Sequence, residues 1–179
     1  SAASDVYKRQ VNPLVQDVSV HVKSAVNSEI KQKIAVEAAG LICPDDSVFI
    51  ASGSTVYAFA ERIRPVGHLN VVTPSLRVAM LMNESEETTV TVLGGVLYKK
   101  SLSVRGEYAA QGFENVICSK LFFGVDGIDL EHGITTSTID EAKLTRKMMK
   151  ASSQNIVLAD SSKFGQRGFG RICALEDID

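Results

Sequence analysis

The sequence predicts an α/β protein whose mostly parallel sheet carries helices on both faces. Short apolar runs rich in β-branched residues alternate with segments of helical periodicity, and the connections between them are short. Such alternation is typical of parallel strands joined by right-handed crossovers, in a Rossmann-like arrangement. The length of 179 residues suits one domain, and an apolar fraction of 45% is enough for a core.

Strands and helices are expected in strict alternation from residue 27 onward. The first helix is expected to run from a cap at Asn27 or Ser28 to Leu41. Its apolar stripe would consist of Ile30, Ile34, Ala38 and Leu41. Strands are expected at 47–51, 69–72, 89–93, 120–125 and 155–159. The helices that follow strands are expected at 55–63, 75–82, 106–116 and 139–151.

The two ends of the chain are expected to differ from its middle. Residues 1–10 show no periodicity and are interpreted as a non-native tail, such as translated adapter sequence, with an ordinary polar tail as the alternative. Residues 11–26 are expected to form a linker remnant or an edge strand, because valines alternate weakly there. Residues 27–179 are interpreted as one domain, truncated at its C-terminus where a further strand is expected.

Composition excludes several classes of function. With 19 basic and 21 acidic residues, the chain lacks the cationic cluster that non-specific nucleic-acid binding needs. Its three cysteines and three histidines have no metal-ligand spacing, so no metal and no cofactor are expected. No apolar stretch approaches the roughly 18 residues of a membrane span, so a soluble, cytoplasmic protein without a membrane partner is expected. The nearest approach to a basic patch is interpreted as a solvated helix face of Lys143, Arg146, Lys147 and Lys150.

Small and polar residues gather where the expected strands end. Because the carboxyl ends of parallel strands share one edge of a sheet, these loops are expected to converge on one ligand-binding crevice. The alternative is that they are merely polar loops. The residues concerned are Gly53, Ser54 and Thr55, then Thr73 and Ser75, then Gly94 and Gly95, then Asp126, Gly127 and Asp129, and finally Lys163.

The first of these loops, 52–55, lies between a strand and a helix. Gly53 lets the backbone approach a ligand, and the free amides of a helix N-terminus favour an anion such as phosphate. A plain helix cap is the alternative. Lys163 and Arg105 are candidate phosphate partners, with a surface lysine and an arginine paired across an interface as their alternatives.

The acidic residues have two interpretations. Asp126 and Asp129 could hold sugar hydroxyls, or act as a base if the pKa of one were raised. The alternative for Asp126 is a turn residue beside Gly127. Glu141 approximates a capping box with Ser137 or Thr138, which favours a structural role.

Taken in order, these motifs resemble the C-terminal sensor domain of DeoR-type transcription regulators. The resemblance runs from about residue 27 to the end of the chain. The motifs that carry it are Ala51-Ser-Gly-Ser-Thr55, Val71-Val-Thr-Pro-Ser-Leu76, Leu93-Gly-Gly95, Gly124-Val-Asp-Gly-Ile-Asp129, Gly133-Ile-Thr-Thr136, Glu141-Ala142 to Met148-Met149, and Ala159-Asp-Ser-Ser-Lys-Phe-Gly165.

The resemblance implies a fold of the ribose-5-phosphate isomerase/CoA-transferase-like kind, and a phosphorylated sugar or small phosphometabolite as effector. It also implies a homo-oligomer and an N-terminal winged helix-turn-helix that binds operator DNA, which is missing from this chain. The ligand contacts implied by the family are Gly53, Ser54, Thr55, Thr73, Ser75, Asp126 and Lys163.

The chain departs from the family and from the isomerase in a few places. Ala51 stands where the family often has Asp, and Leu130 follows Asp129 where the isomerase has Glu. The Lys-Gly-Gly-Gly stretch of the isomerase is replaced by Glu131-His-Gly-Ile-Thr-Thr136. A binding module rather than an enzyme is therefore expected. A sugar-phosphate isomerase-like enzyme and a dimerisation domain with a vestigial pocket stay as alternatives.

Overall fold

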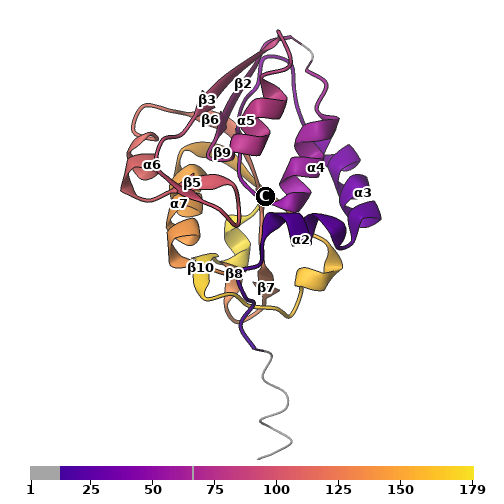
Figure 1. The fold of residues 1–179 in the computed structure, drawn as a ribbon, viewed down its shortest axis with the longest axis vertical. Helices are drawn as coiled ribbons and strands as arrows, with labels where there is room; N and C mark the ends of the chain where they lie inside the picture. The colour runs from indigo at the N-terminus through magenta and orange to yellow at the C-terminus, as the bar shows by residue number, and fades with distance from the viewer. Residues whose placement is uncertain (1–12, 66) are drawn as a thin grey trace, which may run out of the picture.

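The centre of the molecule is one five-stranded parallel sheet, seen in a computed structural model that describes residues 13–65 and 67–179 (Figure 1). Its strands stand in the order β3-β2-β1-β6-β9, and every neighbouring pair is parallel, which confirms the predicted sheet. The strands are β1 (Ser47–Ile50), β2 (Leu69–Thr73), β3 (Thr88–Val92), β6 (Cys118–Gly124) and β9 (Ser152–Leu158).

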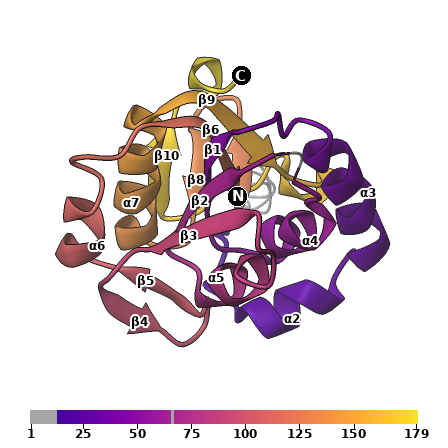
Figure 2. The ribbon, with the colours of Figure 1, turned by 90° about the horizontal axis from the view of Figure 1, so that it is seen from above.

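Helices cover both faces of this sheet, as predicted (Figure 2). Successive strand side chains point to opposite faces, so Val48 and Ile50 pack with one helical layer while Phe49 packs with the other. The first layer is α3 (Ser28–Ala39), α4 (Ser54–Arg62) and α5 (Leu76–Met82). The second is α6 (Glu107–Gln111) and α7 (Ile139–Lys150).

The predicted apolar stripe of the first helix is correct for two of its four residues. Ala38 is buried and Ile34 packs partly buried against the core, whereas Ile30 and Leu41 are 45% and 46% exposed. α3 also buries Lys31 and Ala35. α3 packs against α4, and its small alanine side chains allow the close approach that larger ones would prevent. Asn27 is the N-cap residue, one of the two expected positions, but it adopts a left-handed conformation with φ of 54° and its side chain makes no capping bond.

Five short strands were not expected from the sequence. β4 (Val96–Tyr98) and β5 (Ser103–Arg105) form a hairpin between the strand expected at 89–93 and the helix expected at 106–116, where neither a strand nor a helix was expected. The other three, β7 (Gly127–Asp129), β8 (Gly133–Thr136) and β10 (Gly170–Cys173), form a small antiparallel sheet. Each has only three or four residues, too few to show the alternation by which a strand is recognised.

The segment before α3 contains a helix rather than the edge strand that valine alternation had suggested. α2 (Val20–Ala25) begins at Ser19, whose hydroxyl accepts a hydrogen bond from the His21 backbone. Residues 1–10, interpreted above as a non-native tail, lie outside the described residues. Within the described ranges, none of the helices combines the length and the apolar content that a membrane crossing requires.

Candidate functional site

The connections of the sheet reverse direction between β1 and β6. From β1 the chain proceeds through β2 to β3 on one side, and then returns to β6 and β9 on the other. In open α/β sheets a crevice forms beyond the carboxyl ends of the strands at such a reversal. A cavity of about 270 Å³ lies at this point.

Five of the predicted site residues line this cavity together. Gly53, Ser54 and Thr55 follow β1, Asp126 follows β6, and Lys163 follows β9. Three separate strand ends therefore meet at one place. The structure brings together the hydroxyls, carboxylate and ammonium that the sequence suggested for a polar ligand.

The loop before α4 has the geometry of an anion-binding helix N-terminus. Gly53 is the cap residue, with φ of 134°, a conformation that residues with a side chain rarely adopt. A glycine at the cap offers no side chain to the N–H groups of the first turn, which have no partner within the helix. A Cβ on Gly53 would meet only Val56, at 4.0 Å, so the cavity side of the loop is open to a ligand. These amides are available to an anion.

Two further lysines line the same cavity and were missed from the sequence. Lys31 comes from α3 and Lys23 from α2, and both share the cavity with Lys163. Burial, followed by the nearby Lys163, lowers the pKa of Lys31, although Asp160 opposes this. Cations that repel one another in a buried place are stabilised when an anion binds between them. The predicted stripe named apolar residues alone, so Lys31 was not proposed as a site residue.

Asp126 is held by donors on both of its oxygen atoms. Oδ2 accepts hydrogen bonds from Thr136 Oγ1 and from the amide and hydroxyl of Ser137, each at 3.1 Å. Oδ1 lies 2.8 Å from Lys23 Nζ. Burial acts to raise the pKa of Asp126, but Lys23, Lys163 and Ser137 outweigh it and hold the pKa below its ordinary value. Asp126 is therefore an ionised acceptor inside the cavity.

Glu141 also lines the cavity, which the capping interpretation did not anticipate. One half of that interpretation is confirmed, because the Thr138 hydroxyl accepts a hydrogen bond from the Glu141 amide at the start of α7. The carboxylate itself turns to Arg105, with Oε2 at 3.3 Å from Nη2. Burial raises the pKa of Glu141, and Arg105 opposes that rise.

The loops after β2 and β3 do not reach this cavity. Thr73 is fully buried, and its hydroxyl accepts from the Ser75 amide at 3.0 Å. Ser75 in turn caps α5 through the Val78 amide. Gly94 and Gly95 also lie outside the residues that line the cavity. The expectation of one crevice shared by all five strand ends is therefore wrong for these four residues.

The reason is the unexpected β4–β5 hairpin, which lies over the ends of β2 and β3. The Val104 amide donates to the Pro74 carbonyl at 2.9 Å, and Ser75 pairs with Ser103. A Cβ on Gly95 would lie 2.7 Å from the Arg105 carbonyl, so this glycine is needed for close packing. Polar residues at these two strand ends bind the protein's own backbone.

Arg105 is a structural cation within this hairpin. Its side chain is 3% exposed, and its Nη1 donates to Thr138 Oγ1 at 2.8 Å. Nη2 donates to Ser101 and Glu141, each at 3.3 Å, and the guanidinium lies 4.3 Å from the centre of the Tyr98 ring. These contacts make Arg105 a residue that positions Glu141 and the start of α7.

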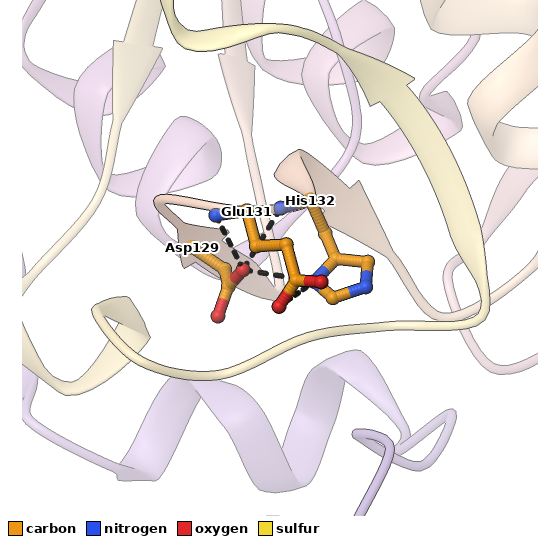
Figure 3. A group of neighbouring side chains, drawn as sticks. All are labelled: Asp129, Glu131 and His132. Atoms are coloured by element: carbon orange, nitrogen blue, oxygen red, sulfur yellow. Dashed lines mark hydrogen bonds and ion pairs between the residues drawn. The ribbon is translucent and has the colours of Figure 1, made fainter.

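Asp129 and Gly127 have structural roles in the β7–β8 hairpin. Figure 3 shows Asp129 Oδ1 facing the backbone amides of Glu131 and His132, at 2.9 and 2.8 Å, and the His132 ring, at 2.9 Å. The imidazole and these amides lower the pKa of Asp129. The three side chains are close enough to share a metal ion, but closure of the hairpin already accounts for their arrangement. Gly127 packs against the Gln166 carbonyl, where a Cβ would not fit.

Comparison with known families and proteins identifies the chain. The profile of the DeoR C terminal sensor domain matches residues 26–179. The chain belongs to this family. The sensor domain is 36% identical over 169 residues to a putative aga operon transcriptional repressor of Escherichia coli O157:H7, covering 94% of this chain and 61% of that protein. It is 33% identical over 169 residues to the HTH-type transcriptional repressor GlcR of Bacillus subtilis strain 168, covering 94% and 64%.

The sensor domain thus spans a little over three fifths of the length of these two relatives. Solved structures show the same fold. Ribose 5-phosphate isomerase A from Methanocaldococcus jannaschii matches 77% of this chain and 55% of its own, with a TM-score of 0.55 and 16% identity. A probable sor operon regulator from Shigella flexneri matches 88% and 84%, with a TM-score of 0.51 and 14% identity. At such identity the likeness concerns the fold alone.

Proposed function

We propose that this sensor domain binds a phosphorylated sugar, or a related small phosphometabolite, in the cavity between β1 and β6. The observation that carries the proposal is the glycine-capped N-terminus of α4 opening into a cavity that also holds Lys31 and Lys163. Free amides, a helix dipole and two ammonium groups at one place favour a dianion. The lowered pKa of Lys31 supports this assignment, because an anion would relieve the repulsion between the lysines.

Other residues of the cavity suit the hydroxyls of a sugar. Asp126 and Glu141 provide carboxyl groups, and Thr136 contributes a hydroxyl group. Charge-assisted hydrogen bonds from sugar hydroxyls to an ionised Asp126 would fix the orientation of the ligand. In a sugar phosphate, the phosphate would bind the amides and lysines, and the hydroxyls of the carbon chain would bind the carboxyl and hydroxyl groups.

The role in the whole protein is part of the same proposal. The two relatives described above are named as repressors, and both are longer than this chain. A winged helix-turn-helix outside this chain would bind operator DNA, and the effector would shift a homo-oligomer between two arrangements of different DNA affinity. Such a shift requires that the effector bind the two arrangements with different affinity.

Calorimetric titration with a panel of hexose and pentose phosphates tests the proposal. At least one of glucose 6-phosphate, fructose 6-phosphate and ribose 5-phosphate is expected to bind, while the corresponding free sugars do not. At 100 times its dissociation constant the ligand stabilises the fold by about 2.7 kcal/mol, which a thermal shift detects. Absence of both heat and thermal shift across a broad panel would overturn the proposal.

An isomerase-like enzyme is the second candidate, favoured by one specific observation. Asp126 and Glu141 line the same cavity, and their surroundings move their pKa values in opposite directions. Such a divergence is found between the ionised and the protonated partner of an acid–base pair. Turnover of ribose 5-phosphate that is lost in Glu141→Gln would favour the enzyme. The binding proposal expects binding of phosphorylated ligand without turnover.

A further inference from the structure

The short helix α2 lies at the mouth of the proposed ligand cavity. Val22, Lys23 and Val26 line the cavity, and the helix contacts α4, beneath which it lies in Figure 1. Of its six residues, all of them described, only Val20 is buried, whereas Val22 is 58% exposed. A helix with so little apolar burial is held mainly by polar contacts, and segments of this kind open at low free-energy cost.

The most direct of these contacts occupies the carboxylate that a sugar would use. The three donors on Asp126 Oδ2 come from Thr136 and Ser137, at the end of β8 and directly after it. The donor on Oδ1 is Lys23 Nζ, at 2.8 Å, and it comes from α2. A ligand hydroxyl that donates to Oδ1 therefore competes with the Lys23 ammonium for this oxygen.

Two further contacts at the C-terminal side of α2 also involve groups of the cavity. Lys31 Nζ donates to the Lys23 carbonyl, and Asn27, which follows the helix, donates to Asp160 Oδ2 at 3.4 Å. Lys31 is one of the two cations proposed to hold the phosphate, and Asp160 lies beside Lys163. A phosphorylated ligand therefore competes for Asp126 and Lys31, two of the groups that hold α2 at the cavity.

We propose that the Lys23–Asp126 ion pair is an autoinhibitory contact, and that ligand binding breaks it and releases α2 from the cavity mouth. The inference rests on the proposed function and adds the means by which occupancy of the cavity is transmitted. The ligand hydroxyl takes Oδ1 of Asp126, and the phosphate draws Lys31 away from the Lys23 carbonyl. Both contacts are lost in the same event, and residues 13–19 move with the helix.

Hydrogen bonds at the N-terminal side of α2 connect it to other parts of the fold, and the proposed movement would be transmitted through them. The Val20 amide donates to the Lys100 carbonyl at 2.7 Å, and Lys100 Nζ donates to the Asp17 carbonyl at 2.9 Å. The Val15 amide donates to the Arg167 carbonyl at 2.8 Å. Residues 13–19 are therefore attached to the β4–β5 turn and to the loop before β10. Release of α2 alters the position of the chain that precedes it.

Amide hydrogen exchange followed by mass spectrometry tests the inference in two steps. In the first, the wild-type chain is compared with and without a saturating member of the phosphosugar panel. Exchange in the 52–55 loop is expected to slow, because its amides bind phosphate, while exchange in Val20–Ala25 accelerates about fivefold, the change expected for loss of a partly exposed ion pair. Slower or unchanged exchange in α2, with protection of the 52–55 loop, would overturn the proposed release of α2 and leave the proposed function intact.

The second step needs no ligand. Lys23→Met is expected to accelerate exchange in α2 about fivefold. The matched control Lys33→Met, at an exposed position of α3, is expected to leave it unchanged. Val20→Ala provides an independent variant, since it removes the buried anchor of α2 without changing the charge of the cavity, and it should accelerate exchange in the same peptide.

The two steps distinguish failure of the proposed α2 release from failure of the proposed ligand site. If no phosphosugar protects the 52–55 loop, the proposed function fails, and the Lys23–Asp126 contact is then judged from the ligand-free variants. If the amides of α2 exchange equally fast in Lys23→Met and Lys33→Met, the Lys23–Asp126 ion pair does not hold α2 in place, and the inference is overturned. Faster exchange confined to Lys23→Met and Val20→Ala would support it.

Discussion

The carboxyl edge of the parallel sheet has two halves that are built from similar residues and arranged differently. On one half, the ends of β1, β6 and β9 open into a cavity lined by Lys31, Lys163 and Asp126. On the other half, the ends of β2 and β3 lie under the β4–β5 hairpin, which bonds to Pro74 and Ser75. Both halves carry loops rich in glycine and hydroxyl residues. Only the half beside the reversal of strand order is open to a ligand.

This difference shows that glycine and hydroxyl residues in a loop can serve backbone conformation and packing without any ligand. Gly53 and Gly95 both have positive φ, of 134° and 143°. The first faces open space, and the second faces the Arg105 carbonyl. The two glycines differ in the element that faces each of them, and strand order and the β4–β5 hairpin determine which element that is.

The largest effect is expected from removing the cation that holds the covered half together. Arg105→Met leaves the partly buried Glu141 without its partner and breaks the bonds to Thr138 and Ser101. Loss of this buried cation, with its ion pair and hydrogen bonds, costs about 3 kcal/mol, measured as the free energy of unfolding in urea. Lys143→Met, on the exposed face of α7, is the control and should cost almost nothing. A loss of less than about 1 kcal/mol in Arg105→Met would show that the hairpin is not held by this residue.

A glycine comparison sharpens the contrast between the two halves directly. Gly53→Ala puts a side chain at a φ of 134° in the open half, and the resulting shift of the loop moves the amides that bind phosphate. Ligand affinity should fall about thirtyfold, equivalent to about 2 kcal/mol, by calorimetry. Gly94→Ala, in the covered half with no atom within 4 Å of the added Cβ, should leave affinity unchanged. Equal losses in the two variants would contradict the assignment of the open half.

A lysine comparison addresses the charge of the cavity. Lys163→Met should weaken binding of a phosphosugar about tenfold, because one charge-assisted hydrogen bond is lost. Lys147→Met, in the groove between α6 and α7, changes the net charge equally without touching the cavity and serves as the control. The corresponding free sugar is expected to bind neither the wild-type chain nor these variants. If Lys147→Met weakened binding as strongly, long-range charge rather than a local contact would explain the result.

The smallest effect concerns the opposite, amino-terminal edge of the sheet. There Lys120 Nζ lies 2.6 Å from Asp46 Oδ2, and although burial acts to raise the pKa of Asp46, Lys120 and the Cys43 amide hold it below its ordinary value. A lowered pKa in the folded state contributes stability that is present above the unfolded value, about 3.9, and is lost as pH falls through the folded value. The stability lost between pH 6 and pH 3 should therefore be smaller in Asp46→Asn than in the wild-type chain, measured by urea unfolding. An identical loss in both proteins would contradict this.

The sequence was sufficient for the central sheet and for part of the site. The five parallel strands and the phosphate-type loop at Gly53 follow from local periodicity and from the position of glycine after a strand. Short strands such as β4 and β5 carry no such periodicity. Asp126 and Asp129 are three residues apart, yet a hairpin turns them to different surroundings.

The remaining site residues depend on tertiary placement. Lys31 was absent from the predicted stripe because that stripe was chosen from apolar residues, and its burial depends on how α3 packs against α4. Lys23 lies in a segment whose alternating valines favour a strand, and its helix forms because packing and polar contacts override that local preference. Glu141 satisfies the spacing of a capping box, and only the buried Arg105 explains why its carboxylate faces the cavity instead.

A crystal structure of the sensor domain with a phosphosugar from the panel tests the central claim most directly. A phosphate oxygen is expected within about 3 Å of the Ser54 and Thr55 amides, with Lys163 as its cationic partner. The competing location is the groove between α6 and α7, which is lined by Lys143, Lys147 and Lys150. Phosphate density in that groove, with the loop at Gly53 unoccupied, would contradict the account.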